Sequence, residues 1–161
     1  MNFIIFKENF EFENYFRILE DKDIYILCKF RTTNHKLPIE TGRWNNIDRI
    51  NRICTKCDSI TIGDEYHYIM ECEHFSSFRN RFIVTNLRET PNIPKFKQIM
   101  SAYQKQNLEK LCKFIRNINK SFALSVVYTV YMFISILYLY LLLYIYVFSV
   151  PLYMVIENKD D

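Results

Sequence analysis

The stretch CTKCDSITIGDEYHYIMEC, from Cys54 to Cys72, carries three of the five cysteines and one of the three histidines of this 161-residue chain. Its spacing is Cys-x2-Cys, nine residues, His, four residues, Cys. The opening residues, MNFIIFKENF, lack the basic n-region of a signal peptide, so we expect reduced thiols. An odd number of cysteines grouped in this way favours a metal site over a disulfide framework.

Zinc fits this ligand set best, because Cys and His side chains at such spacings form tetrahedral structural sites. We expect the ligands to be Cys54, Cys57, His67 and Cys72. His74, which lies two residues after Cys72, remains an alternative fourth ligand. Four protein ligands leave no open position for water or substrate, so the expected site is structural and not hydrolytic.

The residues around the cysteines predict how the ligands are presented. Asp64 is expected to be the N-cap of a short helix that carries His67, and Gly63 to give the backbone freedom needed to enter that helix sharply. Three thiolates and one Zn²⁺ sum to a charge of −1. Arg52 and Lys56 are placed to offset that charge.

The rest of the first 120 residues favours helices, because glycine is scarce and apolar residues recur at irregular spacings of three and four. Pro38, Gly42 and an Asn pair indicate an ordered loop over 35–46. Cys28 and Cys112 stand apart from the cluster and are expected to pack in the core. The predicted helices cover 12–19, 21–32, 74–87, 95–103 and 107–118.

A hydrophobic stretch follows, and residues 121–156 hold no Asp, Glu, Lys or Arg. This length exceeds the ~20 residues that cross a bilayer, so we predict one membrane-spanning helix over about 124–148. Basic residues before it and acidic residues after it predict a single-pass membrane protein whose zinc domain is cytosolic. Seven tyrosines in the stretch leave a second interpretation open, that it is translated non-coding sequence.

These observations predict a mainly α protein with three parts. A small helical zinc-stapled domain covers 1–120, with its zinc cluster at 54–72. A membrane-spanning segment covers 121–156, and a polar C-terminal tail covers 157–161.

The order of the motifs resembles the zinc-binding segment at the C-terminal end of non-LTR (LINE-type) retrotransposon reverse transcriptases. The resemblance is strongest from Cys28 to about Ile83. In this chain the family's blocks correspond to Lys29–Arg31, Asn34-His35, Glu40–Arg43, Cys54 with Cys57, Asp64–His67, and Cys72.

The resemblance implies an accessory module that contacts RNA or DNA. The family's polymerase motif, Tyr-x-Asp-Asp, does not occur in the sequence, so neither polymerisation nor cleavage is expected. A basic strip interleaved with an aromatic ring can neutralise phosphates and stack a base. The residues expected to do so are Arg43, Trp44, Arg49, Arg52 and Lys56, with Arg79 and Arg81 after the cluster.

The leading hypothesis is therefore a non-enzymatic structural-zinc module, truncated from a retrotransposon reverse transcriptase and tethered by a membrane helix. One alternative is a tail-anchored adaptor whose zinc domain binds a protein partner. Another is a retroelement remnant without a selected function. Salt dependence separates nucleic-acid binding from a protein contact, since binding to phosphates weakens steeply as salt is added.

Overall fold

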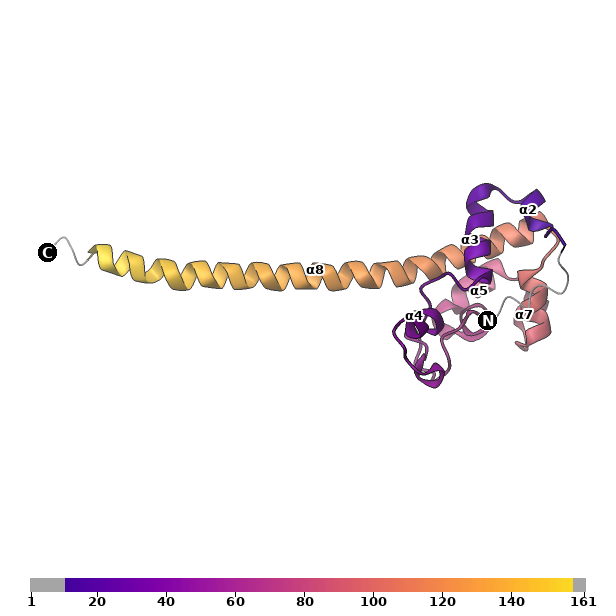
Figure 1. Cartoon of the computed structure of the whole chain (residues 1–161), viewed down its shortest axis with the longest axis horizontal. Coiled ribbons are helices and arrows are strands. Elements are labelled where there is room, and N and C mark those ends of the chain that lie inside the picture. The colour runs from indigo at the N-terminus through magenta and orange to yellow at the C-terminus, as the bar shows by residue number, and fades with distance from the viewer. Residues whose placement is uncertain (1–10, 158–161) are drawn as a thin grey trace. The chain divides into compact units, whose positions relative to one another are not determined.

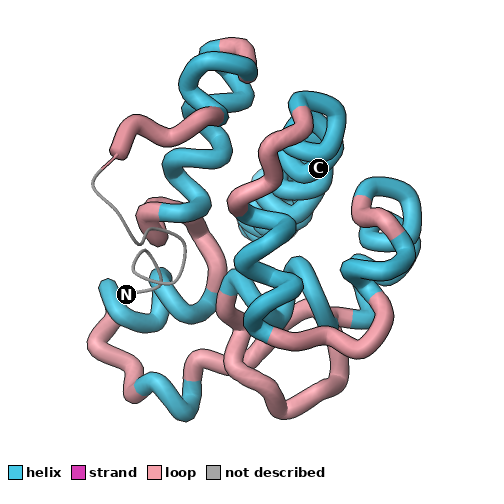
Figure 2. The backbone as a smooth tube through the Cα atoms, turned by 90° about the vertical axis from the view of Figure 1, so that its right-hand side faces the viewer, coloured by secondary structure: helices cyan, strands magenta, loops and turns pink. Residues whose placement is uncertain are grey.

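The computed structural model describes residues 11–157, with backbone only for 124–129 and 147–157. Over these residues the predicted mainly helical fold is confirmed, and the β-structure consists of an isolated bridge between Ile53 and Ile62 (Figures 1 and 2). The predicted tail at 157–161 lies outside the described residues, apart from its first residue. The elements are α2 (Tyr15–Ile18), α3 (Asp21–Arg31), α4 (Pro38–Trp44), η1 (Arg49–Asn51), η2 (His67–Glu71), η3 (Glu73–Phe75), α5 (Ser76–Phe82), α6 (Thr85–Arg88), α7 (Ile93–Met100) and α8 (Lys105–Glu157).

The chain divides into two compact units, Met1–Phe122 and Ala123–Asp161, and α8 contributes residues to each. The first unit holds the hydrophobic core. Its α8 segment contributes side chains three and four positions apart, which places them on one helical face. The fully buried members of this face are Leu108, Leu111, Cys112, Phe114, Ile115 and Ile118. They pack in one cluster with buried residues of α3, η2, η3 and α7.

Ion pairs support this core at its margins. The buried guanidinium of Arg31 donates two hydrogen bonds, of 2.8 and 2.9 Å, to the carboxylate of Glu13. Arg116 of α8 pairs with Asp23 of α3. Cys112 is buried as expected, and burial raises its pKa to about 12, so this thiol remains protonated at neutral pH.

Two local predictions are wrong. The segment expected to be a loop contains α4, because Pro38 occupies the first helical position, where its fixed φ and missing N–H are tolerated. The helix expected over 74–87 is divided, since Ile83 is extended between α5 and α6. At the end of α4, Asn46 takes a positive φ of 54°, a backbone region that asparagine adopts more readily than most residues.

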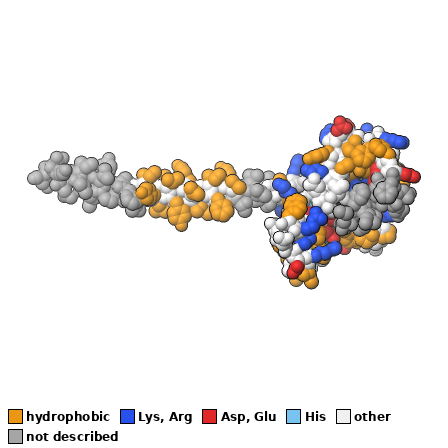
Figure 3. Space-filling view, viewed as in Figure 1, with side chains coloured by type: hydrophobic (Ala, Val, Ile, Leu, Met, Phe, Trp, Pro, Cys, Tyr) orange, Lys and Arg blue, Asp and Glu red, His pale blue; other side chains and the backbone are white. Residues whose placement is uncertain are grey.

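The predicted membrane-spanning helix is also wrong. Within the part of the chain that the structure describes, none of the helices combines the length and the apolar character needed to cross a membrane. Helix α8 does extend to Glu157, and hydrophobic side chains cover its described stretch 130–146 in Figure 3. Many of them are tyrosines, whose polar hydroxyls lie where a spanning helix is usually aliphatic: Tyr131, Tyr138, Tyr140, Tyr144 and Tyr146.

The predicted location depended on that helix and is corrected with it. A single-pass membrane protein with a cytosolic zinc domain requires a spanning segment, which 121–156 was expected to supply. The membrane contact expected through 121–156 was inferred from the same predicted helix.

Candidate metal centre

A short hairpin presents the first two cysteines. The backbone N–H of Cys54 donates to Thr61 O at 2.8 Å, and Gly63 N–H donates to Arg52 O at 2.8 Å. Between Cys54 and Thr61 the chain makes a tight loop, in which Lys56 N–H donates a 3.4 Å hydrogen bond to Cys54 Sγ. The loop therefore brings two sulfurs three residues apart to the same side.

Gly63 allows close packing between this hairpin and α4, because it has no side chain. Its φ is not positive, contrary to the backbone freedom expected from the sequence. A Cβ atom at this position would lie 2.9 Å from Pro38 Cγ and 3.2 Å from Cys54 Cα. Glycine is needed because α4 and the cysteine loop press against this point from two sides.

A π-helix presents the other two ligands. Asp64 caps the helical turn that leads into this π-helix, as predicted, because its Oδ1 accepts a 2.9 Å hydrogen bond from His67 N–H. The helix η2 then closes with a 2.7 Å bond from Cys72 N–H to His67 O, five residues apart. In a π-helix residues i and i+5 are hydrogen-bonded neighbours, so His67 and Cys72 present their side chains to one point.

The structure brings the four expected ligands together. The Sγ atoms of Cys54, Cys57 and Cys72 and a ring nitrogen of His67 all lie within 4.8 Å of one another. Cys54 Sγ is 3.8 Å from Cys72 Sγ and 3.5 Å from Cys57 Sγ. His67 Nε2 is 3.4 Å from Cys57 Sγ. A zinc tetrahedron with ~2.3 Å bonds to sulfur has edges of about 3.8 Å, so these separations fit it.

Neighbouring side chains select the ring nitrogen that faces the cluster. His67 Nδ1 lies 3.1 Å from Thr61 Oγ1 and 3.4 Å from Glu71 Oε2. A proton on Nδ1 is held by these acceptors, which leaves the lone pair of Nε2 directed at the cysteines. His74, the alternative ligand, is exposed and rests its ring against Phe75.

The pKa values of the Cys57 and Cys72 thiols are shifted in opposite directions. Burial opposes the thiolate of Cys57, but hydrogen bonds from Ser59, with smaller contributions from Cys54 and His67, outweigh it and lower the pKa to about 6. Burial, reinforced by the neighbouring Cys54, raises the pKa of Cys72 to about 12. Adjacent thiolates repel one another, and a bound cation removes this conflict.

A hollow of about 240 Å³ adjoins the half-buried Cys57. Its acidic side chains attract a cation towards the sulfurs, since opposite charges lower the energy of approach. The lining residues are Cys57, Asp58, Ser59, Thr61, His67, Glu71 and Glu73.

Arg79, expected to extend a basic surface, is instead 8% exposed and belongs to the centre's surroundings. Its Nη2 donates to Cys72 O at 2.7 Å and its Nε to Ile69 O at 2.9 Å. Burial lowers its pKa, while the nearby groups Cys72 and Glu71, each of which bears a negative charge when ionised, oppose that shift. A guanidinium buried this close to the cluster fits a centre that carries negative charge.

A buried pair also braces the π-helix. His35 Nε2 lies 2.8 Å from Glu65 Oε1, and His35 Nδ1 accepts a 3.4 Å bond from Leu37 N–H. Sequence reasoning missed this pair, although the Asn34-His35 block of the resemblance gave a signal for the histidine. Spacing contained no signal for Glu65, because the two residues are thirty positions apart.

Arg52, one of the expected nucleic-acid residues, makes internal contacts. Its Nε donates to Ile47 O at 2.8 Å and its Nη1 to Ile39 O at 3.1 Å, which satisfies carbonyls in and after α4. Its side chain crosses Gly42 so closely that a Cβ there would lie 2.6 Å from Arg52 Cγ. This arginine holds α4 against the cysteine hairpin.

Lys56 is engaged in a similar way. Its Nζ donates to Ser121 O at 2.9 Å and lies 4.7 Å from the centroid of the Phe122 ring. The lysine therefore joins the cysteine loop to α8 within the first unit.

The remaining three expected residues lie on the surface. Trp44 is 56% exposed, and Arg49 in η1 is also exposed. Arg43 is exposed and pairs with Glu40 at 2.5 Å. The structure thus divides the expected basic strip into an outer group (Arg43, Trp44 and Arg49) and an inner pair that packs against the protein.

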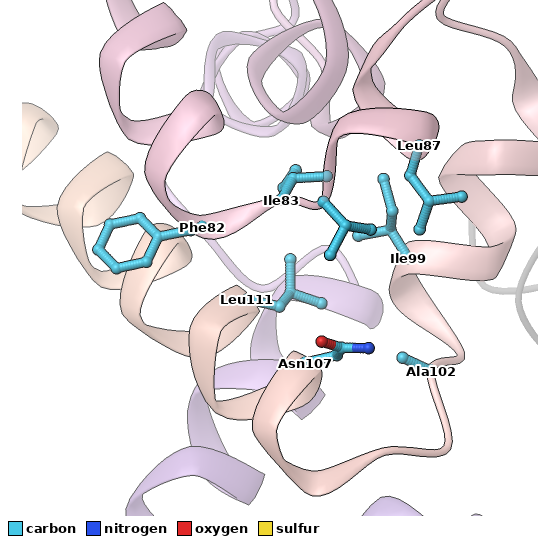
Figure 4. Close-up of a pocket in the computed structure, with 8 residues that line it drawn as sticks. Phe82, Ile83, Leu87, Ile99, Ala102, Asn107 and Leu111 are labelled. Carbon is cyan, nitrogen blue, oxygen red and sulfur yellow. The ribbon is translucent and has the colours of Figure 1, made fainter.

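A second pocket shares no residue with the metal cluster. It is a small apolar recess where the end of α5, α6, α7 and the start of α8 meet, with Asn107 as its polar member (Figure 4). Its lining residues are Phe82, Ile83, Val84, Leu87, Ile99, Ala102, Asn107 and Leu111.

Comparison with protein-family models, curated proteins and solved structures finds no match to this chain. The likeness to reverse transcriptase zinc segments therefore rests on the order of its motifs.

Proposed function

We propose that this chain is a non-catalytic binding module stabilised by one Zn²⁺ held by Cys54, Cys57, His67 and Cys72. The observation that carries the proposal is the convergence of these four ligand atoms within 4.8 Å. Thiolate and imidazole ligands in a tetrahedral arrangement suit zinc better than the harder cations that prefer oxygen. The sulfur separations of 3.5 and 3.8 Å match the edges of such a site.

A structural role follows from the number of ligands. Zinc with four protein ligands has no position open for water or a substrate, so hydrolytic chemistry is not expected. The metal instead links the cysteine hairpin to the π-helix. Structural zinc sites supply ~10–16 kcal/mol of apparent binding energy in small domains, which is large beside the marginal stability of most folds.

For the role of the module we propose contact with single-stranded RNA or DNA through the outer group Arg43, Trp44 and Arg49. Trp44 offers an exposed ring on which a base can stack, and the two arginines flank it in sequence. The resemblance to the zinc segment of LINE-type reverse transcriptases supports the same role and a retroelement origin.

A protein partner is the second candidate, and the exposure of isoleucines favours it. Ile47, Ile50 and Ile60 are 42%, 77% and 90% exposed on the segment between α4 and the π-helix. A protein partner would cover these side chains, since contiguous exposed apolar surface is typical of protein interaction sites.

Metal content and salt dependence test the proposal. The purified full chain is expected to contain one equivalent of zinc by elemental analysis, and less than a tenth of an equivalent would refute the metal centre. Two phosphate contacts predict that log affinity for a single-stranded oligonucleotide falls against log salt with a slope of about −1.4. Absence of oligonucleotide binding at low salt would favour the protein partner.

A further inference from the structure

Arg79 lies on α5 and reaches back to the end of the π-helix. Its two hydrogen bonds join it to the carbonyl of a metal ligand, Cys72, and to the carbonyl of Ile69, three residues earlier. Carbonyls in the last turn of a helix lack helical partners and need donors from elsewhere. The guanidinium supplies those donors where the chain turns from the π-helix into η3.

Hydrogen bonds to carbonyls do not balance the charge of this group. Arginine stays protonated in proteins, and a buried charge is costly unless an opposite charge lies nearby. Both carbonyls are neutral, whereas the carboxylate of Glu71 carries a negative charge that favours the guanidinium. Glu71 is 41% exposed through its side chain, so solvent screens its contribution.

We propose that Arg79 is a positioning residue of the metal centre and supplies its counter-charge. This inference rests on the proposed zinc site. Three thiolates and Zn²⁺ carry a net charge of −1, and the guanidinium carries +1. Through the carbonyl of Cys72 it also fixes the backbone from which that ligand's sulfur projects. Outer partners that orient a ligand usually change metal affinity 10- to 100-fold when removed.

Two substitutions separate the charge from the hydrogen bonds. Arg79→Gln removes the charge and retains one amide donor, and we expect it to weaken zinc binding 10- to 100-fold. Arg79→Lys retains the charge but cannot span both carbonyls, so its loss should be smaller. Zinc affinity is measured by competition with a chromophoric chelator at a temperature where circular dichroism shows each variant folded.

The absorption spectrum of the Co²⁺-substituted protein tests the charge of Arg79 separately, because loss of packing alone is not expected to shift its thiolate-to-metal charge-transfer band. A positive charge near the sulfurs lowers the energy of their lone pairs, so its removal should shift the thiolate-to-Co²⁺ charge-transfer band to longer wavelength. Arg79→Gln is expected to show this shift, and Arg79→Lys to keep the band of the unsubstituted protein. Equal affinity losses in the two variants with unmoved bands would overturn the proposal.

Arg31→Gln is the matched control. It also removes a buried guanidinium, but one that pairs with Glu13. We expect lower thermal stability with an unshifted cobalt band and zinc affinity within about threefold. If the unsubstituted chain binds neither metal, the zinc centre itself is refuted. If the unsubstituted chain binds both zinc and cobalt, and Arg79→Gln has the same zinc affinity and the same cobalt band, only the role of Arg79 is refuted.

Discussion

His35 Nε2 lies 2.8 Å from Glu65 Oε1, and both side chains are buried. The contact joins the segment before α4 to the residue that follows the capping Asp64. Since Leu37 N–H donates to Nδ1, the ring carries its proton on Nε2 and donates it to the carboxylate. This bond holds in place the first turn of the helix that carries His67.

His35→Ala should therefore destabilise the folded chain. Removing a hydrogen bond to a buried charged group costs about 1.5–3 kcal/mol in free energy of unfolding. His35→Gln places an amide donor near the position of Nε2 and should lose less. Urea unfolding in excess zinc measures both values, and equal stability of His35→Ala and the unsubstituted chain would contradict the bracing role.

Cys72→Ser and Cys112→Ser should differ in metal content. Both cysteines are buried, but only Cys72 belongs to the ligand cluster. We expect Cys72→Ser to lose zinc and unfold at a lower temperature, because a structural metal stabilises the fold that forms its site. Cys112→Ser should retain one equivalent by elemental analysis. Zinc loss in both variants would indicate that general destabilisation, and not ligation, controls metal content.

Thiol modification should follow the pKa order in the metal-free chain. With a pKa of about 6, Cys57 is mostly thiolate at pH 7, whereas Cys72 and Cys112 are held protonated by burial. Alkylation of Cys57 should rise through pH 6 and precede that of Cys72 and Cys112 in mass spectra. Zinc should protect it. Uniform labelling of these thiols at pH 7 would contradict the structure of the cluster.

The lowered pKa of Cys57 also predicts how the stability of the metal-free chain changes with pH. The folded-state pKa of Cys57 lies below its ordinary value of 9.0. Ionisation of Cys57 therefore contributes its full stabilisation above pH 9 and loses it as pH falls through 6. Cys57→Ser should flatten this part of the profile of melting temperature against pH.

Arg49→Gln and Arg52→Gln should separate binding from stability. Arg49 is exposed in η1, so its loss should weaken oligonucleotide binding and leave the melting temperature unchanged. Arg52 bonds to Ile39 O and Ile47 O, so its loss should lower the melting temperature. Trp44→Ala should reduce affinity about 5- to 100-fold if the ring stacks a base. Fluorescence anisotropy and thermal scans measure the two effects.

The sequence by itself predicted the candidate cluster, apart from the choice between His67 and His74, and most of the helices. Soft side chains at short spacing identify Cys54, Cys57 and Cys72, and a carboxylate three residues before His67 identifies its cap. These features are local, because a turn or a helix start is specified within a few residues.

Only the tertiary structure decided which charges face solvent. Arg49, Arg52 and Arg79 look alike in sequence, yet one is exposed, one satisfies carbonyls around α4 and one lies buried behind Cys72. The π-turn that aligns His67 with Cys72 and the pairing of His35 with Glu65 also depend on the fold. The physical reason is that burial and partner choice are set by segments distant in the chain, whose approach no local spacing encodes.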